Sequence, residues 1–122
     1  MNRIAIDKAN KILTEHISQV RTVTEWAQMM GYAPQVFTRI YRNYYRKKPI
    51  EEITEIRMGK LVELLRSGKE YYNYELAYLV GLRDEKDLCS FINYHRGCSP
   101  TIFKMNLKNS KNGVVRGLPE LS

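Results

Sequence analysis

Five polar or basic side chains recur at helical spacing within one short stretch of the chain. At 3.6 residues per turn, a helix over residues 34–46 places on one face Gln35, Thr38, Arg39, Arg42 and Arg46. Amide, hydroxyl and guanidinium groups hydrogen-bond to base edges and to phosphates. No acidic residue occurs between Met30 and Ile50, and Lys47 and Lys48 extend the basic run. The stretch suits insertion into a DNA major groove; a solvated surface helix is the alternative.

The opposite face of the same stretch is apolar and aromatic. Phe37, Ile40, Tyr41 and Tyr44 fall on one stripe, which we expect to pack against the rest of the protein. Pro34 suits the first turn of a helix, because the N–H that proline lacks would have no helical partner there. The stretch is therefore predicted to be a helix with a buried back and a basic front.

A second short helix is predicted just before this stretch. Thr22 and Glu25 form a capping box, which satisfies free amides at a helix start. An apolar run over residues 26–30 follows, and Gly31 can take the left-handed conformation that ends a helix. Because the small Ala27 lets two helices approach closely, the pair is predicted to be a helix-turn-helix.

The remaining helices are predicted from apolar spacing and from helix-breaking residues. We expect a first helix over about residues 3–18, a long fourth helix from Ile50 to the break at Ser67-Gly68, a fifth helix capped by Asn73, a sixth capped by Asp84, and a seventh that starts at Pro100 with Ile102, Phe103 and Leu107 on its apolar side. The predicted fold is all-α with about seven helices. After about Lys108 the sequence has no periodicity, so a mobile tail is expected.

An internal repeat is the strongest pattern in the chain. Trp26, Ala27, Met30 and Gly31 recur fifty residues later as Leu76, Ala77, Val80 and Gly81, and Phe37, Ile40, Tyr41, Tyr44 and Pro49 recur fifty-one later as Leu88, Phe91, Ile92, His95 and Pro100. Two helix-turn-helix units are therefore predicted: a first unit (1–49), a linker helix (50–68), a second unit (69–109) and a flexible tail (110–122). A linker helix roughly 25 Å long could space two elements for successive major grooves, about 34 Å apart.

Composition narrows the class of protein. The 122 residues suit one domain or two very small ones, and 20 Lys and Arg against 13 Asp and Glu give a net charge of +7. A basic chain favours a polyanionic partner, either nucleic acid or an anionic membrane surface. The one tryptophan lies on a predicted inner face, which disfavours a membrane-surface helix. No long apolar run or signal peptide is found, so we expect a cytoplasmic protein.

Neither catalysis nor metal binding is indicated by the sequence. His16 and His95 are isolated, and no metal-ligand spacing, phosphate-binding glycine loop or triad-like arrangement occurs. We therefore expect no enzyme activity, no cofactor and no metal. Cys89 and Cys98 are predicted to be free thiols in or beside one helix, packed as small apolar residues.

These motifs together resemble the DNA-binding module of the AraC/XylS family of bacterial transcription regulators, over about residues 22–104. The resemblance lies in Ala27-x-x-x-Gly31-x-x-Pro34, Phe37-Thr38-Arg39-Ile40-Tyr41, Pro49, Arg57, Glu75-Leu76-Ala77-x-x-x-Gly81 and Gly97-x-Ser99-Pro100-x-x-Phe103-Lys104. It implies two helix-turn-helix units joined by a long helix, either as a short single-module regulator of the MarA and SoxS type or as the C-terminal module of a longer one. It also implies that double-stranded DNA and RNA polymerase are partners and that the protein associates with the nucleoid. Because one chain carries two predicted recognition helices, we expect that a monomer can bind DNA.

The resemblance also assigns roles to individual positions. Its base-reading sites in the first unit fall on Gln35, Thr38 and Arg39, with Arg42 at a phosphate-contacting site. In the second unit they fall on Glu85, Lys86, Cys89 and Ser90, with Asn93 opposite Arg42. Arg46, Lys47 and Lys48 are further candidates for phosphate contacts. Arg46 stands where the family usually has a glycine, so the helix either continues further or ends under strain.

The second unit departs from the family pattern by its acidic residues. Asp84 and Asp87 could cap the sixth helix and meet its dipole. Glu85 could instead accept a hydrogen bond from cytosine. In a third interpretation this unit binds DNA weakly and contacts a protein.

A cluster of tyrosines leaves two interpretations open. Tyr71, Tyr72 and Tyr74 could stack on bases, although packing between the fourth and fifth helices is the preferred expectation.

The sequence favours a sequence-specific DNA-binding transcription regulator, with recognition helices 34–46 and 85–96 in adjacent major grooves. The first unit is expected to dominate affinity. A protein-interaction adaptor with weak or non-specific DNA binding is the alternative.

Overall fold

The computed structural model describes residues 3–111. Its elements are η1 (Ile6–Lys8), α1 (Ala9–Glu15), η2 (Ile17–Gln19), α2 (Val23–Met30), α3 (Pro34–Tyr45), α4 (Pro49–Arg66), α5 (Asn73–Leu79), α6 (Glu85–Arg96) and α7 (Pro100–Lys111). The all-α prediction is confirmed, since these residues form helices and no strand. None of the described helices is long and apolar enough to cross a membrane.

The predicted first helix over residues 3–18 is broken into three pieces. Only α1 is α-helical, because His16 leaves helical geometry at φ −122° and a 3-10 turn follows it. The segment is instead tethered by side chains from other helices. The indole of Trp26 donates to the carbonyl of Ala9 (3.1 Å), and the hydroxyls of Tyr32 and Tyr45 donate to Ile4 and Ile6. Of the apolar residues whose spacing predicted a buried face, Ala9, Leu13 and Ile17 are buried, whereas Ala5 is exposed. The spacing gave no signal for these tertiary bonds.

The boundaries of the first helix pair follow the predicted signals. The Thr22 hydroxyl accepts from the Glu25 N–H, and the Glu25 carboxylate accepts from the Thr22 N–H. Gly31 ends α2 in the left-handed region at φ 88°, and Pro34 begins α3. The helix ends at Tyr45, one residue short of the predicted 34–46.

The second helix pair differs from the prediction at its start. Tyr72 rather than Asn73 precedes the first turn of α5, and the Glu75 carboxylate accepts from the Tyr72 N–H at 2.8 Å. The Asn73 side chain instead accepts from the amine of Lys104 (2.9 Å). Asp84 does cap α6, because its carboxylate accepts from the Asp87 N–H at 2.9 Å.

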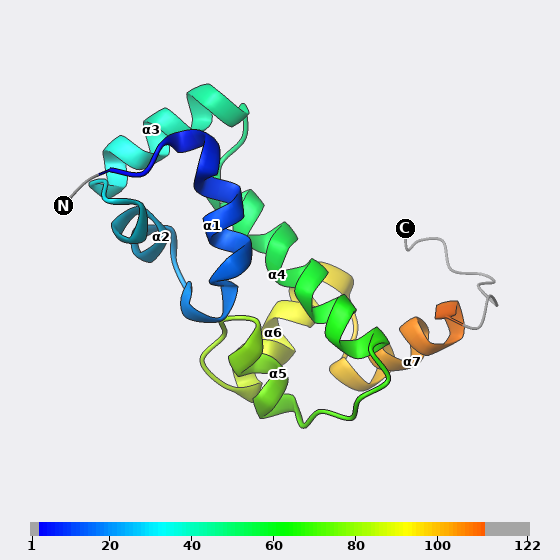
Figure 1. The fold of residues 1–122 in the computed structure, drawn as a ribbon. Coiled ribbons are helices and arrows are strands. Elements are labelled where there is room, and N and C mark those ends of the chain that lie inside the picture. Colours follow the sequence, from blue (N-terminus) through cyan, green and yellow to red (C-terminus); the bar gives the residue numbers. More distant parts are fainter. Residues whose placement is uncertain (1–2, 112–122) are drawn as a thin grey trace.

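Two hydrophobic clusters lie at opposite ends of α4. The first cluster consists of Ala9, Leu13, Ile17, Val20, Trp26, Ala27, Met30, Phe37, Tyr41 and Ile53. The second consists of Met58, Leu61, Leu76, Ala77, Val80, Leu88, Ile92 and Phe103. Figure 1 shows α2 and α3 towards one end of α4, and α5, α6 and α7 towards the other. The division into units 1–49 and 69–109 with a linker 50–68 stays a proposal, to which the structure adds that α4 packs into both clusters.

Two residues predicted on buried stripes are exposed, and the last helix extends into the predicted tail. Tyr44 is 56% exposed and Ile102 is 45% exposed, so neither belongs to the apolar side of its helix. Tyr45 takes the place of Tyr44 against the first cluster. Helix α7 continues to Lys111, and residues 112–122 of the predicted tail lie outside the described residues.

Candidate nucleic-acid interface

The outward face of α3 borders a shallow, open groove beside the start of α2. The groove has a volume of about 700 Å³ and is lined by Val23, Thr24, Pro34, Gln35, Thr38, Arg39, Arg42 and Asn43. All three predicted base-reading residues of the first unit and Arg42 lie in this lining. Among the residues that the structure describes, no acidic side chain lines this groove.

The back of α3 is held rigidly by aromatic packing. The rings of Phe37 and Tyr41 each meet the Trp26 ring edge-on, with centroids 5.1 Å apart. The Tyr41 hydroxyl donates to the side-chain oxygen of Asn10 at 2.7 Å, so α3 is also tied to α1. Burial raises the pKa of Tyr41 well above its ordinary range, which keeps this hydroxyl a donor. The groove residues therefore project from a fixed support, as a reader of base edges requires.

Two polar groove residues are not among the site residues predicted from the sequence. Thr24 lies in the first turn of α2 and lines the groove opposite α3, and Asn43 lies one turn beyond Arg39 on the exposed face. The helical spacing from Arg39 to Asn43 is a signal that could have indicated Asn43. The capping box at Thr22 predicts where α2 begins and therefore that Thr24 lies in its first turn. It does not predict where the Thr24 side chain points.

Arg46 ends α3 in the left-handed region, at φ 63° and ψ 32°. Of the two sequence expectations, the structure thus favours termination under strain. A non-glycine residue in this region costs on the order of 1 kcal/mol. The Arg46 side chain is exposed just beyond the groove lining.

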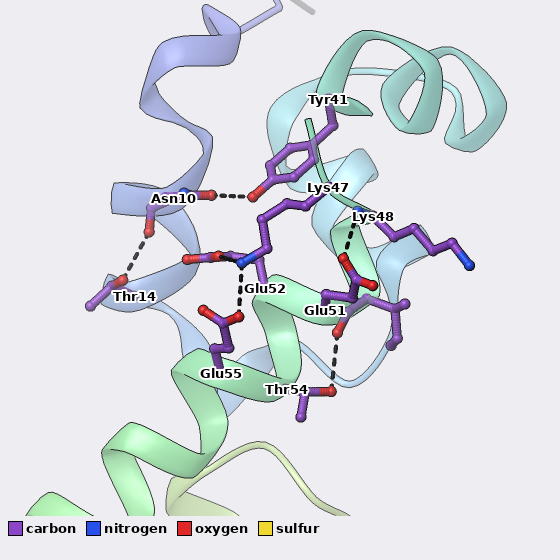
Figure 2. A network of polar contacts seen from close by, with 10 residues as sticks. Asn10, Thr14, Tyr41, Lys47, Lys48, Glu51, Glu52, Thr54 and Glu55 are labelled. Atoms are coloured by element: carbon purple, nitrogen blue, oxygen red, sulfur yellow. Dashed lines mark hydrogen bonds and ion pairs between the residues drawn. The ribbon is translucent and has the colours of Figure 1, made fainter. Parts of the chain in front are cut away.

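Lys47 and Lys48 differ in their surroundings. The amine of Lys47 lies 2.7 Å from a Glu52 oxygen and 3.0 Å from a Glu55 oxygen, which Figure 2 shows as two dashed contacts. The hydrogen bond to Glu52, followed by that to Glu55, raises the pKa of Lys47. Lys48 is exposed, and its side chain extends away from these carboxylates in Figure 2. Because two carboxylates compensate the charge of Lys47, we expect this residue to make no net phosphate contact, which stays to be tested.

We expect Lys47→Ala and Lys48→Ala to separate stability from DNA binding. Lys47→Ala should leave the salt dependence of DNA binding unchanged and cost about 0.2–1 kcal/mol of stability, the usual range for partly exposed ion pairs. Lys48→Ala should leave stability unchanged and reduce the slope of log affinity against log salt by about 0.9, the value of one phosphate contact. Salt titrations and urea unfolding of both variants measure this, and the reverse pattern would contradict the assignment.

In the second unit, α6 presents its predicted site residues to solvent. Glu85, Lys86, Cys89, Ser90 and Asn93 are all exposed on it. Cys89 is therefore not the packed residue that we expected, whereas Cys98 is partly buried against the second cluster. Both thiols are free, as predicted.

The acidic residues at the start of α6 have local partners. Asp84 caps the helix, and a carboxylate oxygen of Asp87 lies 2.9 Å from Nε of Arg83. The hydrogen bond from Arg83 lowers the pKa of Asp87. Capping is thus confirmed for Asp84, whereas Asp87 forms an ion pair across one turn. The role of Glu85 stays a prediction.

The tyrosines before and within α5 do not pack as expected. Tyr72 and Tyr74 are 69% and 59% exposed, and their rings stack on each other with centroids 5.5 Å apart. Only Tyr71 packs against the second cluster. Tyr74 corresponds in the repeat to Thr24 of the first unit, so an aromatic ring stands where that unit has a hydroxyl.

The ring of His95 is partly buried beside Phe91, and this burial lowers the pKa of His95. Within residues 3–111 no group of three or more His, Cys, Asp or Glu side chains is placed to hold a metal ion.

No protein-family model matches the chain, and no curated protein sequence matches it. Several solved structures do. The DNA-binding domain of AdpA, a global transcriptional factor solved in complex with a target DNA, is 18% identical, with 90% of this chain and 97% of that chain covered and a TM-score of 0.73. The C-terminal domain of AraT, a response regulator from Geobacillus stearothermophilus, is 22% identical over 99% and 97%, with a TM-score of 0.70.

A third similar structure carries the family term itself. It is a transcriptional regulator of the AraC-type DNA-binding domain-containing proteins from Chromobacterium violaceum, 15% identical over 84% of this chain and 90% of that chain, with a TM-score of 0.65. The chain therefore has the fold of AraC-type DNA-binding domains, as its sequence resemblance implied. At these identities the similarity shows the fold alone.

Proposed function

We propose that this chain is a sequence-specific double-stranded DNA-binding transcription regulator. One observation carries the proposal: Gln35, Thr38, Arg39 and Arg42 line one groove, and none of the other described residues in its lining is acidic. The shared fold supports it, because the similar AdpA domain was solved with its target DNA. Guanidinium, amide and hydroxyl groups on a rigid helix are suited to reading base edges and positioning on phosphates.

In this proposal α3 and α6 lie in adjacent major grooves, and the first unit dominates affinity. Gln35, Thr38 and Arg39 read bases, while Arg42, Arg46 and Lys48 contact phosphates. Glu85, Lys86, Cys89 and Ser90 are proposed base contacts of the second unit, with Asn93 near the backbone. With two reading helices on one chain, a monomer suffices. RNA polymerase is a proposed partner, in a bacterial cytoplasm where the protein would associate with the nucleoid.

Selection from a pool of random duplexes, followed by sequencing, tests this function. We expect a bipartite site whose two elements lie about one helical turn apart, as for two reading heads on one DNA face. Titration of the selected duplex with salt should then give a slope of about 0.9 per phosphate contact. A scrambled duplex of the same composition is the control. A single short element would restrict base reading to the first unit.

A protein-interaction adaptor is the second candidate function. It is favoured by the second unit, where Asp84 and Glu85 lie at the start of α6 and Tyr72 and Tyr74 are exposed. This function predicts that no sequence is enriched in the selection and that DNA binding is weak and driven only by charge.

A further inference from the structure

Arg57 lies in α4 at the boundary between the two hydrophobic clusters. Ile53, one turn before it, belongs to the first hydrophobic cluster, and Met58 and Leu61 belong to the second. Arg57 is only 6% exposed. It is the one buried charged residue among those the structure describes. Such a position calls for a specific explanation, because burying a guanidinium is costly.

The guanidinium of Arg57 bonds to both units at once. Its Nε donates to the carbonyl of Val80 at 2.7 Å, and its Nη2 donates to the carbonyl of Val20 at 2.5 Å. Val20 directly follows η2 and is buried in the first cluster, whereas Val80 directly follows α5 and is buried in the second. A single side chain therefore joins one backbone carbonyl of each core.

Gly81 makes a second contact between the two units at the same place. It adopts φ +85°, and a Cβ built on it would lie 2.2 Å from the carbonyl oxygen of Ile17 and 2.8 Å from that of Val20. Those distances leave no room for a side chain. The backbone after α5 thus lies directly against the backbone of η2, beside the carbonyl that Arg57 holds.

The chemistry of arginine suits this arrangement. Its planar fork directs two donors to two acceptors, whereas a lysine amine is a single point of charge. Burial lowers the pKa of Arg57 to about 10, with the attraction of Glu25 opposing that change, so the group stays charged at neutral pH. Hydrogen bonds to two carbonyls offset part of the desolvation. Because a buried charge adds little net stability, its benefit lies in geometry.

We propose that Arg57 and Gly81 form an interdomain clamp that fixes the rotation and distance between α3 and α6, and thereby sets the spacing of the two DNA elements. The clamp is defined as these two residues with the carbonyls of Ile17, Val20 and Val80. Its consequence for DNA rests on the proposed function. Its geometric part, a fixed relation between two helices, does not.

Spacing variants of the selected duplex test the consequence for DNA. Each inserted base pair moves an element about 3.4 Å and turns it by roughly a tenth of a helical turn. Wild-type protein should lose about tenfold in affinity when the spacing changes by two base pairs, a typical coupling between linked sites. Arg57→Gln should bind all spacings within a few-fold of one another, at the affinity of a duplex with one element, and its affinity for that single element should be unchanged.

A measurement without DNA tests the geometry. In a Cys98→Ser background, spin labels on the exposed native Cys89 of α6 and on Asn43→Cys of α3 report the distance distribution between the two helices. We expect a single narrow distribution with Arg57 and a clearly broader one with Arg57→Gln. Lys60→Gln, which removes a cation from the same helix, is the matched control and should leave the distribution narrow.

The two readouts separate the possible failures. An unchanged distribution in Arg57→Gln overturns the clamp. A broadened distribution without any selected bipartite site supports the clamp and overturns two-headed DNA reading. Parallel losses on single-element and bipartite duplexes would mean that Arg57 serves stability alone. If Arg57→Gln does not fold, Arg57→Lys takes its place, and a narrow distribution in that variant would equally overturn the proposal.

Discussion

Replacing Arg39 or Arg42 with alanine is expected to weaken binding to the selected duplex by roughly 5- to 150-fold, the equivalent of about 1–3 kcal/mol. Both side chains line the groove beside α2. Two changes in the second unit, Lys86→Ala and Asn93→Ala, should cost only a few-fold, because acidic residues lie at the start of α6. Fluorescence anisotropy with labelled duplexes at fixed salt measures all four.

The two arginines should differ in how binding is lost. Arg39→Ala should relax specificity at one base position, since it removes a base contact. Arg42→Ala should weaken all sequences alike and reduce the salt slope by about 0.9. Tyr78→Ala, a change at an exposed residue of α5 away from the first unit, is the control and should bind as wild type. Equal losses in the two units would contradict the dominance of the first.

The groove-lining face of α3 could be predicted because it depends on local rules. A proline at the first helical position and a helical period fix which residues share a face, so the sequence alone places Gln35, Thr38 and Arg39 together. The internal repeat then predicts the second helix pair and the all-α fold. Such signals are short in range and repeat within the chain.

The errors lie where tertiary contacts decide. The helical period places Tyr44 on the buried stripe, yet Tyr45 is covered, because its hydroxyl reaches the carbonyl of Ile6 in the N-terminal segment. In the sequence, Lys47 is one of several neighbouring cations. In the structure, the first two turns of α4 bring the carboxylates of Glu52 and Glu55 to its amine. Both cases depend on which other segment packs against the C-terminal end of α3: the N-terminal segment for Tyr45, and α4 for Lys47.

The contacts of Arg57 could not be predicted from the sequence, for a different reason. Arg57 lies in the long helix and is one of the residues that carry the resemblance to the AraC/XylS family. No contact of its side chain could be predicted from the sequence. Its partners are backbone carbonyls 37 and 23 residues away, at Val20 and Val80. Carbonyls carry no residue signature, so no pattern of side chains could have indicated them. The same holds for Gly81, whose neighbours are also carbonyl oxygens.

Trp26→Ala is expected to destabilise the protein by about 3–5 kcal/mol, the usual cost of removing a large buried aromatic. Trp26 is fully buried, its ring contacts Phe37 and Tyr41, and its indole N–H satisfies the carbonyl of Ala9. The change therefore opens a cavity behind α3 and removes the hydrogen bond that ties α2 to the start of α1. Urea unfolding followed by circular dichroism measures the loss, since the variant lacks the only tryptophan of the chain.

Two further variants divide this effect and connect it to DNA binding. Trp26→Phe keeps an aromatic ring but removes the N–H, so it should cost less than Trp26→Ala and include about 0.5–1.5 kcal/mol for the lost hydrogen bond to the Ala9 carbonyl. Tyr78→Ala, at an exposed position, should change stability by no more than about 0.5 kcal/mol. A loss below about 1 kcal/mol in Trp26→Ala would contradict the proposed support of α3. Because this loss acts through folding, the DNA affinity of Trp26→Ala should recover when the folded state is restored by cooling or stabilising osmolytes, whereas that of Arg39→Ala should not.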